Sequence, residues 1–395
     1  MSETILIKNR VQSIDILRGI VMVIMALDHT RDFFHYSSSM GADPMDLETT
    51  TPFFFFTRWI THFCAPVFVF LSGTSVFLFE AKGKTKKHVS TFLLTRGLWL
   101  MLVEILIIVP LWEFSFNSID LQVIWAIGLC MVIFSGLIFL PVRVLLFIGI
   151  IIIFGHNLLD GIKIQEENWQ SFLWSLLHER HAFPLTENMQ ILVAYPFLPW
   201  LGLMITGYCM GTLYSKNYPA AKRKNILLFT GLGLIIVFIL IRSFNIYGDM
   251  HQWAVQRSPL YTFLDFIKIT KYPPSLLFIL ITIGIALVVL SRMENVSNML
   301  TNKIAVFGKV PFFYYIAHLF VIHLTAFILF FIKGGTWEQL DPTGFNNSNL
   351  PPSFGFSLTV TYIAWIGIIF VLYFPCRWYN NYKSNHKEKW WLSYL

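Results

Sequence analysis

Apolar residues along this chain occur in long runs that are separated by short polar segments. A run of about 20 apolar residues matches the hydrocarbon thickness of a bilayer, so each long run predicts a membrane-spanning helix. About ten such runs are present, and the predicted fold is an all-α, polytopic membrane helix bundle. Their approximate ranges are 13–34, 54–80, 90–111, 119–140, 142–159, 189–213, 225–245, 273–291, 305–332 and 357–376.

The connections between these runs alternate in charge. Lysines and arginines gather at every second connection, as in 82–87 and 222–224, whereas the connection after the first run is acidic. Because basic loops stay on the cytoplasmic side, both termini are predicted to be cytoplasmic. Residues 1–395 are expected to form a single transmembrane domain with long outward-facing loops at 160–188, 246–272 and 333–356. The first of these loops contains an expected interfacial helix, and the last is expected to be irregular.

The composition agrees with a membrane protein that is surrounded by lipid. Hydrophobic residues make up 56% of the chain and charged residues only 13%, against about 25% charged residues in an ordinary soluble protein. The net charge of +7 sits in short loops, so no soluble basic domain is left that would bind nucleic acid. The four cysteines are dispersed without ligand spacing, and we expect neither a disulfide framework nor a metal site.

The first run combines an apolar span with ionisable residues. Arg18 and His29 are eleven residues apart, which is about three helical turns, so both side chains project from one face. An ionisable group inside a membrane segment costs about 2.5 to 3.5 kcal/mol and is usually retained because it faces a partner or a water-filled cavity. This face is therefore the first place to look for chemistry.

Polar residues also cluster at the predicted outer ends of several other spans. A concave outer-leaflet site accounts for them together, since scattered side chains would each leave an unpaired group in hydrocarbon. The candidates are Asp28, His29 and Asp32 in the first span, Arg58 and His62 in the second, Gln122 and Trp125 in the fourth, His156 and Asn157 in the fifth, Lys271 and Tyr272 before the eighth, and His318 and His323 in the ninth.

Each candidate also has a structural interpretation. Arg58 with His62 is spaced as a helix-end pair that merely faces headgroups, and Arg18 is near enough to its helix end to snorkel. His318 is too deep to snorkel, and its alternative is a hydrogen bond to a neighbouring helix. Chemically, His29 suits a general base, with Asp28 or Asp32 to orient it, and Arg18 and Arg58 suit phosphate or oxyanion binding.

The segment SIDILRGIVMVIMALDH resembles the opening helix of the transmembrane acyltransferase superfamily. FTRWITHFCAPVFVFLSGTS, LQVIWAIGLCM, FGHNLLDG, YPFLPWLGLMITGYCMG, KYPPSLLFILITIG and GKVPFFYYIAHLFVIH resemble recurring blocks of its bacterial branch related to heparan-α-glucosaminide N-acetyltransferase. These blocks are spread over nearly the whole chain. The resemblance implies an acyl-CoA donor, such as acetyl-CoA, that enters from the cytoplasm and an acceptor on the outer side.

The resemblance also suggests roles for individual residues. The spacing of Arg18 and His29 is similar to that in membrane O-acyltransferases, which implies that Arg18 contacts the acyl donor and that His29 is catalytic. In the lysosomal heparan enzyme the position of His29 is not histidine and the active histidine lies further on, so His35 competes with His29. We favour His29 because it shares a helix face with Arg18.

The resemblance thus implies a multi-pass acyltransferase of the bacterial inner membrane that moves an acetyl or short acyl group to a sugar hydroxyl or amine. Arg58 and His62 would bind the acceptor or stabilise the oxyanion. An alternative from another class is a proton-coupled transporter or a lipid- or glycan-handling protein that uses the same side chains as a proton relay. The oligomeric state is left open, with a homodimer as one option, as is the choice between an acyl-histidine intermediate and direct transfer.

Overall fold

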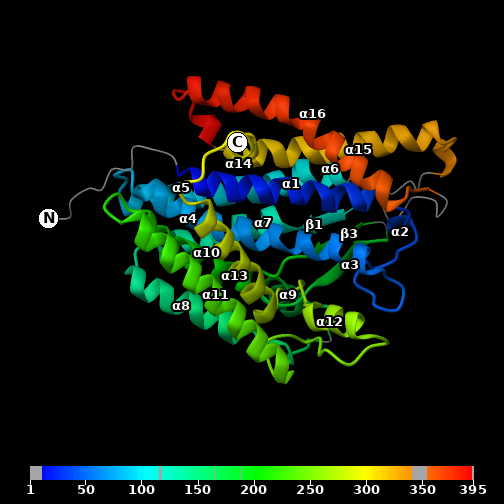
Figure 1. Cartoon of the computed structure of the whole chain (residues 1–395), viewed down its shortest axis with the longest axis horizontal. Coiled ribbons are helices and arrows are strands. Elements are labelled where there is room, and N and C mark those ends of the chain that lie inside the picture. The colour runs from blue at the N-terminus through cyan, green and yellow to red at the C-terminus, as the bar shows by residue number, and fades with distance from the viewer. Residues whose placement is uncertain (1–10, 115–117, 165, 188, 340–353, 394–395) are drawn as a thin grey trace.

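A computed structural model shows a bundle of long helices that lie roughly parallel, with a small sheet near one end (Figure 1). It describes residues 11–114, 118–164, 166–187, 189–339 and 354–393. The long helices are α1 (Gln12–Phe34), α4 (Cys64–Glu80), α5 (Lys86–Val103), α7 (Val123–Leu137), α8 (Val142–Gly155), α10 (Phe197–Gly211), α11 (Ala220–Phe244), α13 (Leu276–Met293), α14 (Met299–Lys309), α15 (Pro311–Ile332) and α16 (Leu358–Asn385).

The helical bundle predicted from the apolar runs is confirmed. Among the described residues, seven segments are long and apolar enough to cross a membrane. They are Pro52–Glu80, Lys86–Glu113, Val142–Leu159, Ala220–Phe244, Leu276–Met293, Pro311–Ile332 and Leu358–Asn385. The other three expected spans correspond to α1, which carries several charges, and to α7 and α10, which are 15 residues each. The orientation of the termini stays a prediction.

Two of the expected spans begin as strands instead of helices. Strand β1 (Ser118–Leu121) pairs in parallel with β3 (Met189–Val193), and β2 (His181–Thr186) pairs antiparallel with β3. The apolar runs did not reveal this because a short run before a helix reads as part of that helix. In the case of β3, Pro196 is the N-cap of α10, and a proline disfavours helical geometry in the residue before it.

Prolines also set other boundaries that differ from the expected ones. The run at 305–332 is divided between α14 and α15, with Val310 between them and Pro311 in the first turn of α15. The missing N–H of proline is harmless at that position, since it would have no intrahelical partner. Helix α13 starts only at Leu276, after Pro273 and Pro274, and the Ser275 side chain accepts a hydrogen bond from the backbone N–H of Phe278.

Several short elements lie toward the end of the bundle where α1 finishes, at the right in Figure 1. They are the sheet and the helices α2 (Tyr36–Ser39), α3 (Pro52–Trp59), α6 (Val109–Glu113), α9 (Trp169–Leu177) and α12 (Pro259–Ile267). Helices α9 and α12 belong to two of the three loops predicted to face outward, and α9 is the helix that was expected in the loop 160–188. Most of the loop expected to be irregular, residues 340–353, lies outside the described residues.

Two helical irregularities connect the long helices to the short ones. The 3-10 turn η1 (Ile60–Phe63) joins α3 to α4, and the π-helical turn η2 (Glu104–Ile108) joins α5 to α6. Each keeps the chain helical while changing which side chains face the interior. Turns of the π type occur frequently at functional sites.

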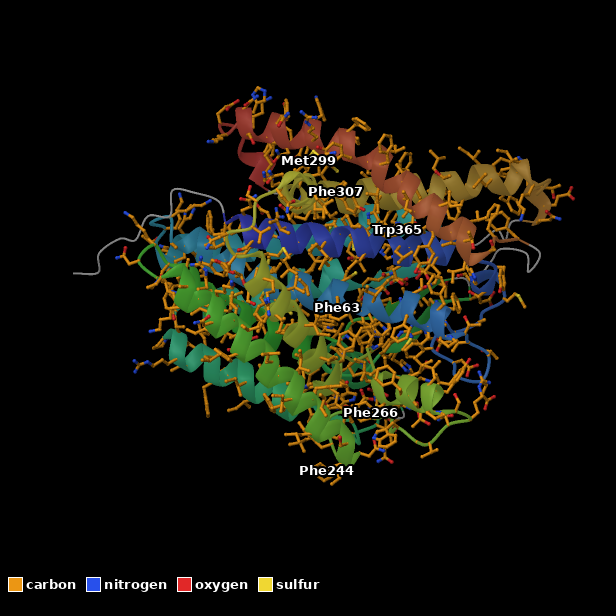
Figure 2. The ribbon with its side chains drawn as sticks, viewed as in Figure 1. Phe63, Phe244, Phe266, Met299, Phe307 and Trp365 are labelled. Carbon is orange, nitrogen blue, oxygen red and sulfur yellow. The ribbon has the colours of Figure 1, made fainter. Side chains whose placement is uncertain are left out.

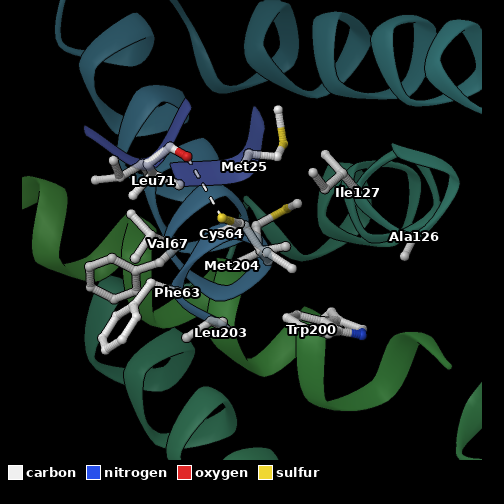
Figure 3. Close-up of a cluster of buried hydrophobic side chains, with 14 of the residues drawn as sticks. Met25, Phe63, Cys64, Val67, Leu71, Ala126, Ile127, Trp200, Leu203 and Met204 are labelled. Atoms are coloured by element: carbon white, nitrogen blue, oxygen red, sulfur yellow. Dashed lines mark hydrogen bonds between the residues drawn. The ribbon is translucent and has the colours of Figure 1, made fainter. Parts of the chain in front are cut away.

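The core lies between α1, α4, α7 and α10. Figure 3 shows Met25, Cys64, Leu71, Ile127 and Met204 from these four helices, and the thiol of Cys64 donates to the Val21 carbonyl at 3.7 Å. Figure 2 places Phe63 inside the bundle and Phe244 at its edge, in agreement with exposed fractions of 9% and 71%. All four cysteines are buried and free, as expected for packing residues.

Glycines allow α1 to approach its neighbour α14 closely. A Cβ atom on Gly308 would lie 1.9 Å from the Asp15 carbonyl oxygen, and one on Gly19 would lie 2.1 Å from the Ile304 carbonyl oxygen. Contacts of this kind between small residues are the usual way in which membrane helices pack at short distance. They hold α1 in the middle of the bundle.

We expect Gly308→Ala to lower the midpoint of thermal unfolding in detergent, because its methyl group forces α1 and α14 apart. Overpacking of this kind costs about 1 to 3 kcal/mol. Gly136→Ala is the matched control, since Gly136 is an exposed helical residue with nothing within 4 Å of the added Cβ. The control midpoint should stay equal or rise, and equal midpoints for the two variants would contradict the packing described for Gly308.

Candidate functional site

The C-terminal half of α1 presents two polar faces to the surrounding helices. Successive residues of a helix are turned by about 100°, so the side chains of Asp28 and His29 point in different directions. Asp28 and Arg31 face α3 and η1, whereas His29 faces α6 and α15. Asp32 lies between these faces, because it contacts Arg31 and also approaches His29.

Asp28 is the centre of an ion-pair network. Arg58 Nη1 donates to both Asp28 carboxylate oxygens at 2.7 and 2.6 Å, and Arg31 Nη2 lies 2.8 Å from one of them. The Thr61 hydroxyl donates to the same carboxylate at 2.9 Å. Asp28 is only 6% exposed, so its charge is balanced inside the protein by side chains from α1, α3 and η1. Asp28 is therefore anchored to these groups and makes no hydrogen bond to His29 among the described contacts.

His29 lies on the other face with a ring nitrogen left unpaired. Its Nδ1 atom is buried without a hydrogen-bond partner among the described residues, and it is 3.8 Å from Asp32 Oδ2. The ring meets the Trp112 ring edge-on, with 4.8 Å between centroids, and lies 5.2 Å from the His318 ring. The His29 side chain is 14% exposed, so it is partly reachable from outside the protein.

The orientation of His318 follows from its backbone contact. Its Nδ1 atom lies 3.0 Å from the Tyr314 carbonyl, and a carbonyl oxygen can only accept, so Nδ1 carries the proton. A neutral His318 then has a lone pair on Nε2, and this buried atom has no partner among the described residues. His29 and His318 thus bring two unpaired ring nitrogens into one place, which calls for a polar ligand or water between them.

Aromatic side chains cover the rest of this face. Trp112 Nε1 donates to the Gln122 side chain at 3.2 Å, which fixes the indole beside His29. The Phe33 ring stacks on His323 at 4.6 Å, and His323 Nδ1 donates to the Leu111 carbonyl at 2.7 Å. Gln122 and His323 therefore hold α6 in place, at the junction of α1, α6 and α15.

The predicted residues Lys271, Tyr272 and His62 lie near the Asp28 network. Lys271 and Arg58 are close enough to Asp28, His62 and Tyr272 for their charges to interact. The hydroxyl groups of Tyr272 and Tyr195 are 3.4 Å apart. His62 Nδ1 is buried without a partner among the described residues. The structure thus brings several of the predicted residues together in a second polar cluster, and their functional roles stay predictions.

Other predicted residues make structural contacts in this structure. Both His156 ring nitrogens face backbone carbonyls, including that of Pro274 at 2.9 Å. The Asn157 side chain accepts from the Leu276 N–H at 2.8 Å and so caps the start of α13. The Trp125 indole is buried, and its backbone N–H donates to Glu104 at 3.0 Å.

Arg18 lies toward the opposite end of α1. Eleven residues of helix separate it from His29 by about 16 Å. Its guanidinium donates to Ser75 Oγ at 2.9 Å and to the Gly308 carbonyl at 3.4 Å. Arg18 therefore connects α1 with α4 and α14, and it belongs to a separate region from the His29 cluster.

Three side chains at the site are close enough together to bind a metal ion. Asp28, His29 and Asp32 each place one ligand atom within 4.8 Å of the others. Arg31 and Arg58 already contact the two carboxylates, and these positive charges compete with a metal ion for the same oxygens. The expectation that no metal is needed stays a prediction.

One known protein family matches more than half of this chain. A model of the catalytic region of heparan-alpha-glucosaminide N-acetyltransferase matches residues 10–247, which is more than half of the 395 residues. The chain belongs to this acetyltransferase family. The family resemblance seen in the sequence is thereby confirmed. No protein with a curated description matches the chain.

The match to the acetyltransferase family covers only part of the site. It includes α1, α3 and η1, and so Arg18, Asp28, His29 and Arg58. Lys271, Tyr272, His318 and His323 lie beyond residue 247, on segments that pack against the matched part. The site of this family member is thus built from both portions of the chain.

The structure also brings in residues that sequence reasoning overlooked. Glu104 is fully buried in the π-helical turn, and its Oε1 atom has no partner among the described residues. A single acid inside an apolar span is itself a signal of function, so Glu104 was detectable. Arg31 is three residues after Asp28, a spacing that also fits a simple helix-end pair, so its role in the Asp28 network could not be inferred from the sequence. Nothing in the sequence distinguished Trp112 from an interfacial tryptophan.

We expect Asp28→Asn to lower the midpoint of thermal unfolding strongly, because it leaves Arg31 and Arg58 buried or half-buried without their shared carboxylate. Removing one partner from a buried ion pair typically costs about 3 to 5 kcal/mol. Glu179→Gln is the control, since Glu179 pairs with the exposed Lys163 at 2.6 Å, and surface pairs are worth about 0 to 1 kcal/mol. Equal losses in the two variants would refute the anchoring role of Asp28.

Proposed function

We propose that this chain is an acyl-CoA-dependent acetyltransferase of the bacterial inner membrane. It moves an acetyl or other short acyl group from cytoplasmic acyl-CoA to a hydroxyl or amine of a sugar or glycan at the outer face. The observation that carries the proposal is His29, on the same helix as Arg18. Its Nδ1 atom has no hydrogen-bond partner among the described residues and lies 3.8 Å from Asp32, and its ring lies 5.2 Å from that of His318. Membership of the acetyltransferase family supports the reaction class.

His29 is the better general base of the two competing histidines. His35 Nδ1 accepts a hydrogen bond from the Ser37 N–H at 3.2 Å. Its ring stacks on Phe54 and lies 4.3 Å from the Tyr36 ring. Burial and the positive charge of Arg31 lower the pKa of His35 to about 4, so it binds a proton weakly near neutral pH. His29 Nδ1 has no hydrogen-bond partner among the described residues, and imidazole is the side chain most often used as a general base.

In the proposed reaction the acceptor oxygen or nitrogen attacks the thioester carbonyl carbon while His29 removes its proton. Collapse of the tetrahedral intermediate breaks the carbon–sulfur bond, and the proton on His29 passes to the departing thiolate of coenzyme A. Asp32 stabilises the imidazolium that forms for part of the cycle, as a carboxylate does beside other catalytic histidines. A brief acyl-histidine would use the same groups.

Arg18 is proposed to bind a phosphate of the donor. The separation of about 16 Å along α1 suits a long pantetheine arm that runs beside the helix from Arg18 toward His29. His62 and Arg58 are proposed to contact the acceptor or the oxyanion. In this arrangement one helix presents both the donor-binding residue and the base.

The test measures acetyl-CoA binding and coenzyme A release by the purified protein in detergent. We expect His29→Ala to lower turnover about a hundredfold or more, the usual effect of losing a general base, while acetyl-CoA binding is kept. His35→Ala should keep turnover in the fraction that remains folded. The control is His181→Ala, since the His181 side chain is 44% exposed on β2.

Two outcomes would count against the proposal. Full turnover in His29→Ala, with loss in His35→Ala, would move the catalytic role to His35. If the wild type does not bind acetyl-CoA, the chain is not an acyl-CoA-dependent transferase. The proton-coupled transporter then becomes the favoured function.

A further inference from the structure

Glu104 is a buried acid that has no role in the reaction proposed above. It is 0% exposed and lies in the π-helical turn η2, inside an otherwise apolar segment. It forms no ion pair in the described part of the chain, and the charged side chain that acts on it is another carboxylate, Asp120. An acid inside a membrane span is costly to keep, so Glu104 requires a compensating contact of another kind.

The compensating contact is with the first turn of α7. Glu104 Oε2 accepts a hydrogen bond from the Trp125 N–H at 3.0 Å and also interacts with the Ile124 N–H. Helix α7 starts at Val123, and its N-cap residue, Gln122, provides no side-chain cap. The first N–H groups of a helix lack partners within the helix, and the positive end of the helix dipole favours a negative charge. Glu104 therefore caps α7 from an earlier part of the chain.

A second contact joins the same two segments. Helix α6 follows η2 directly, and Trp112 of α6 donates through Nε1 to the Gln122 side chain at 3.2 Å. Gln122 in turn donates to Asp120 at 3.3 Å. Glu104 and Trp112 belong to one continuous helical segment, and Gln122 and Trp125 belong to the start of α7. Two hydrogen bonds thus connect η2 and α6 with the N-terminus of α7.

Trp112 connects these two segments to the proposed base. Its ring meets the His29 ring edge-on, with 4.8 Å between centroids, and lies 5.1 Å from the Phe33 ring. Proton transfer requires that the reacting atoms are held in line, and a displacement of about 1 Å can cost about a hundredfold in rate. A shift of α6 relative to α7 moves Trp112 and so changes the surroundings of His29.

We propose that Glu104 is a positioning residue for His29. Its carboxylate caps α7, the start of α7 holds Gln122, and Gln122 holds Trp112 against the imidazole. This inference rests on the proposed function, in which His29 is the general base. Glu104 acts through Trp112 and makes no hydrogen bond to His29 among the described contacts.

A proton-carrying role is the alternative for Glu104. Glu104 and Tyr315 are close enough for their charges to interact, and the Tyr315 ring lies 5.5 Å from the His318 ring. The cap is favoured because Glu104 bonds directly to α7, whereas no hydrogen bond joins it to Tyr315 among the described contacts. The two roles need different groups at position 104. A cap needs an acceptor oxygen at the full reach of the side chain, and a proton carrier needs an ionisable group.

The test compares Glu104→Gln with Glu104→Asp. Release of coenzyme A from acetyl-CoA is measured with glucosamine as the acceptor, using the full-length protein in detergent. Glutamine keeps a carbonyl oxygen at the same reach, and its amide nitrogen replaces Oε1, which has no partner among the described residues. Glu104→Gln should therefore retain most of the kcat.

Glu104→Asp keeps the charge but is one methylene group shorter, so its carboxylate withdraws from the Trp125 N–H. Its kcat should fall about tenfold or more, because the support of His29 is loosened. The KM for acetyl-CoA should stay unchanged in both variants, since Arg18, the residue proposed to bind the donor, is about 16 Å from His29 along α1.

A double-mutant cycle tests the route through Trp112. Trp112→Leu should lower kcat, and adding Glu104→Asp should lower it little further, because residues that act through one route are not independent. Gln122→Met removes the hydrogen bond to Trp112 and leaves Glu104 in place. It should lower kcat as Glu104→Asp does, and it replaces that variant in the cycle if Glu104→Asp does not fold.

Thr85→Ala is the control for the loss of a helix cap. The Thr85 hydroxyl accepts from the His88 N–H at 3.2 Å and caps the opposite end of α5, so this variant should keep the wild-type kcat. Thermal unfolding of every variant in detergent shows which of them are folded before their rates are compared.

Each outcome decides between the roles. Full kcat in Glu104→Asp with loss in Glu104→Gln assigns the proton-carrying role, and any other order than a higher kcat in Glu104→Gln also overturns the inference. Losses that multiply in the double mutant overturn it as well. All of these results leave the proposed function intact. Failure of the wild type to release coenzyme A is the separate failure of the proposed function.

Discussion

The carboxylate of Asp28, buried inside a helix bundle, has to be balanced by cations, and the arrangement around α1 follows from this requirement. Its partners come from the same helix and from α3 with the turn η1. Because Asp28 is taken by Arg58, Arg31 and Thr61, it is not available to His29. Asp32, whose Oδ2 atom lies 3.8 Å from His29 Nδ1, remains beside the imidazole. The Asp28 ion-pair network thus lies on one face of α1, and the residues suited to proton transfer lie on another.

Close helix packing makes this central position of α1 attainable. Gly19 and Gly308 remove the side chains that would keep α1 and α14 apart, so α1 lies deep in the bundle with neighbours on several sides. Interior placement desolvates its charges, which strengthens each interaction among them. The same placement leaves some donors and acceptors without partners in the described part of the chain, namely His29 Nδ1, Arg31 Nη1 and His318 Nε2. Such atoms, when they gather, are a more specific indication of a ligand than a polar residue alone.

Much of this organisation could be predicted from the sequence, because hydrophobic runs and helical spacing are local properties. The expectation that His29, Arg58 and Lys271 lie toward the outer ends of their spans came from the position of each residue in its apolar run. The pairing of Asp28 with Arg58 did not, since the two are 30 residues apart and only the fold joins them. The strands β1 and β3 were missed because each precedes a helix directly.

The π-helical turn at Glu104–Ile108 limits the insertions and deletions that this protein can tolerate. Such a turn contains one residue more than an α-helical turn. Deleting one residue there would restore regular helix and rotate everything after it by about 100°. Trp112 would then turn away from His29, and the Leu111 carbonyl would no longer meet His323. The length of this segment is thus fixed by the residues that follow it, although its apolar sequence would accept many substitutions.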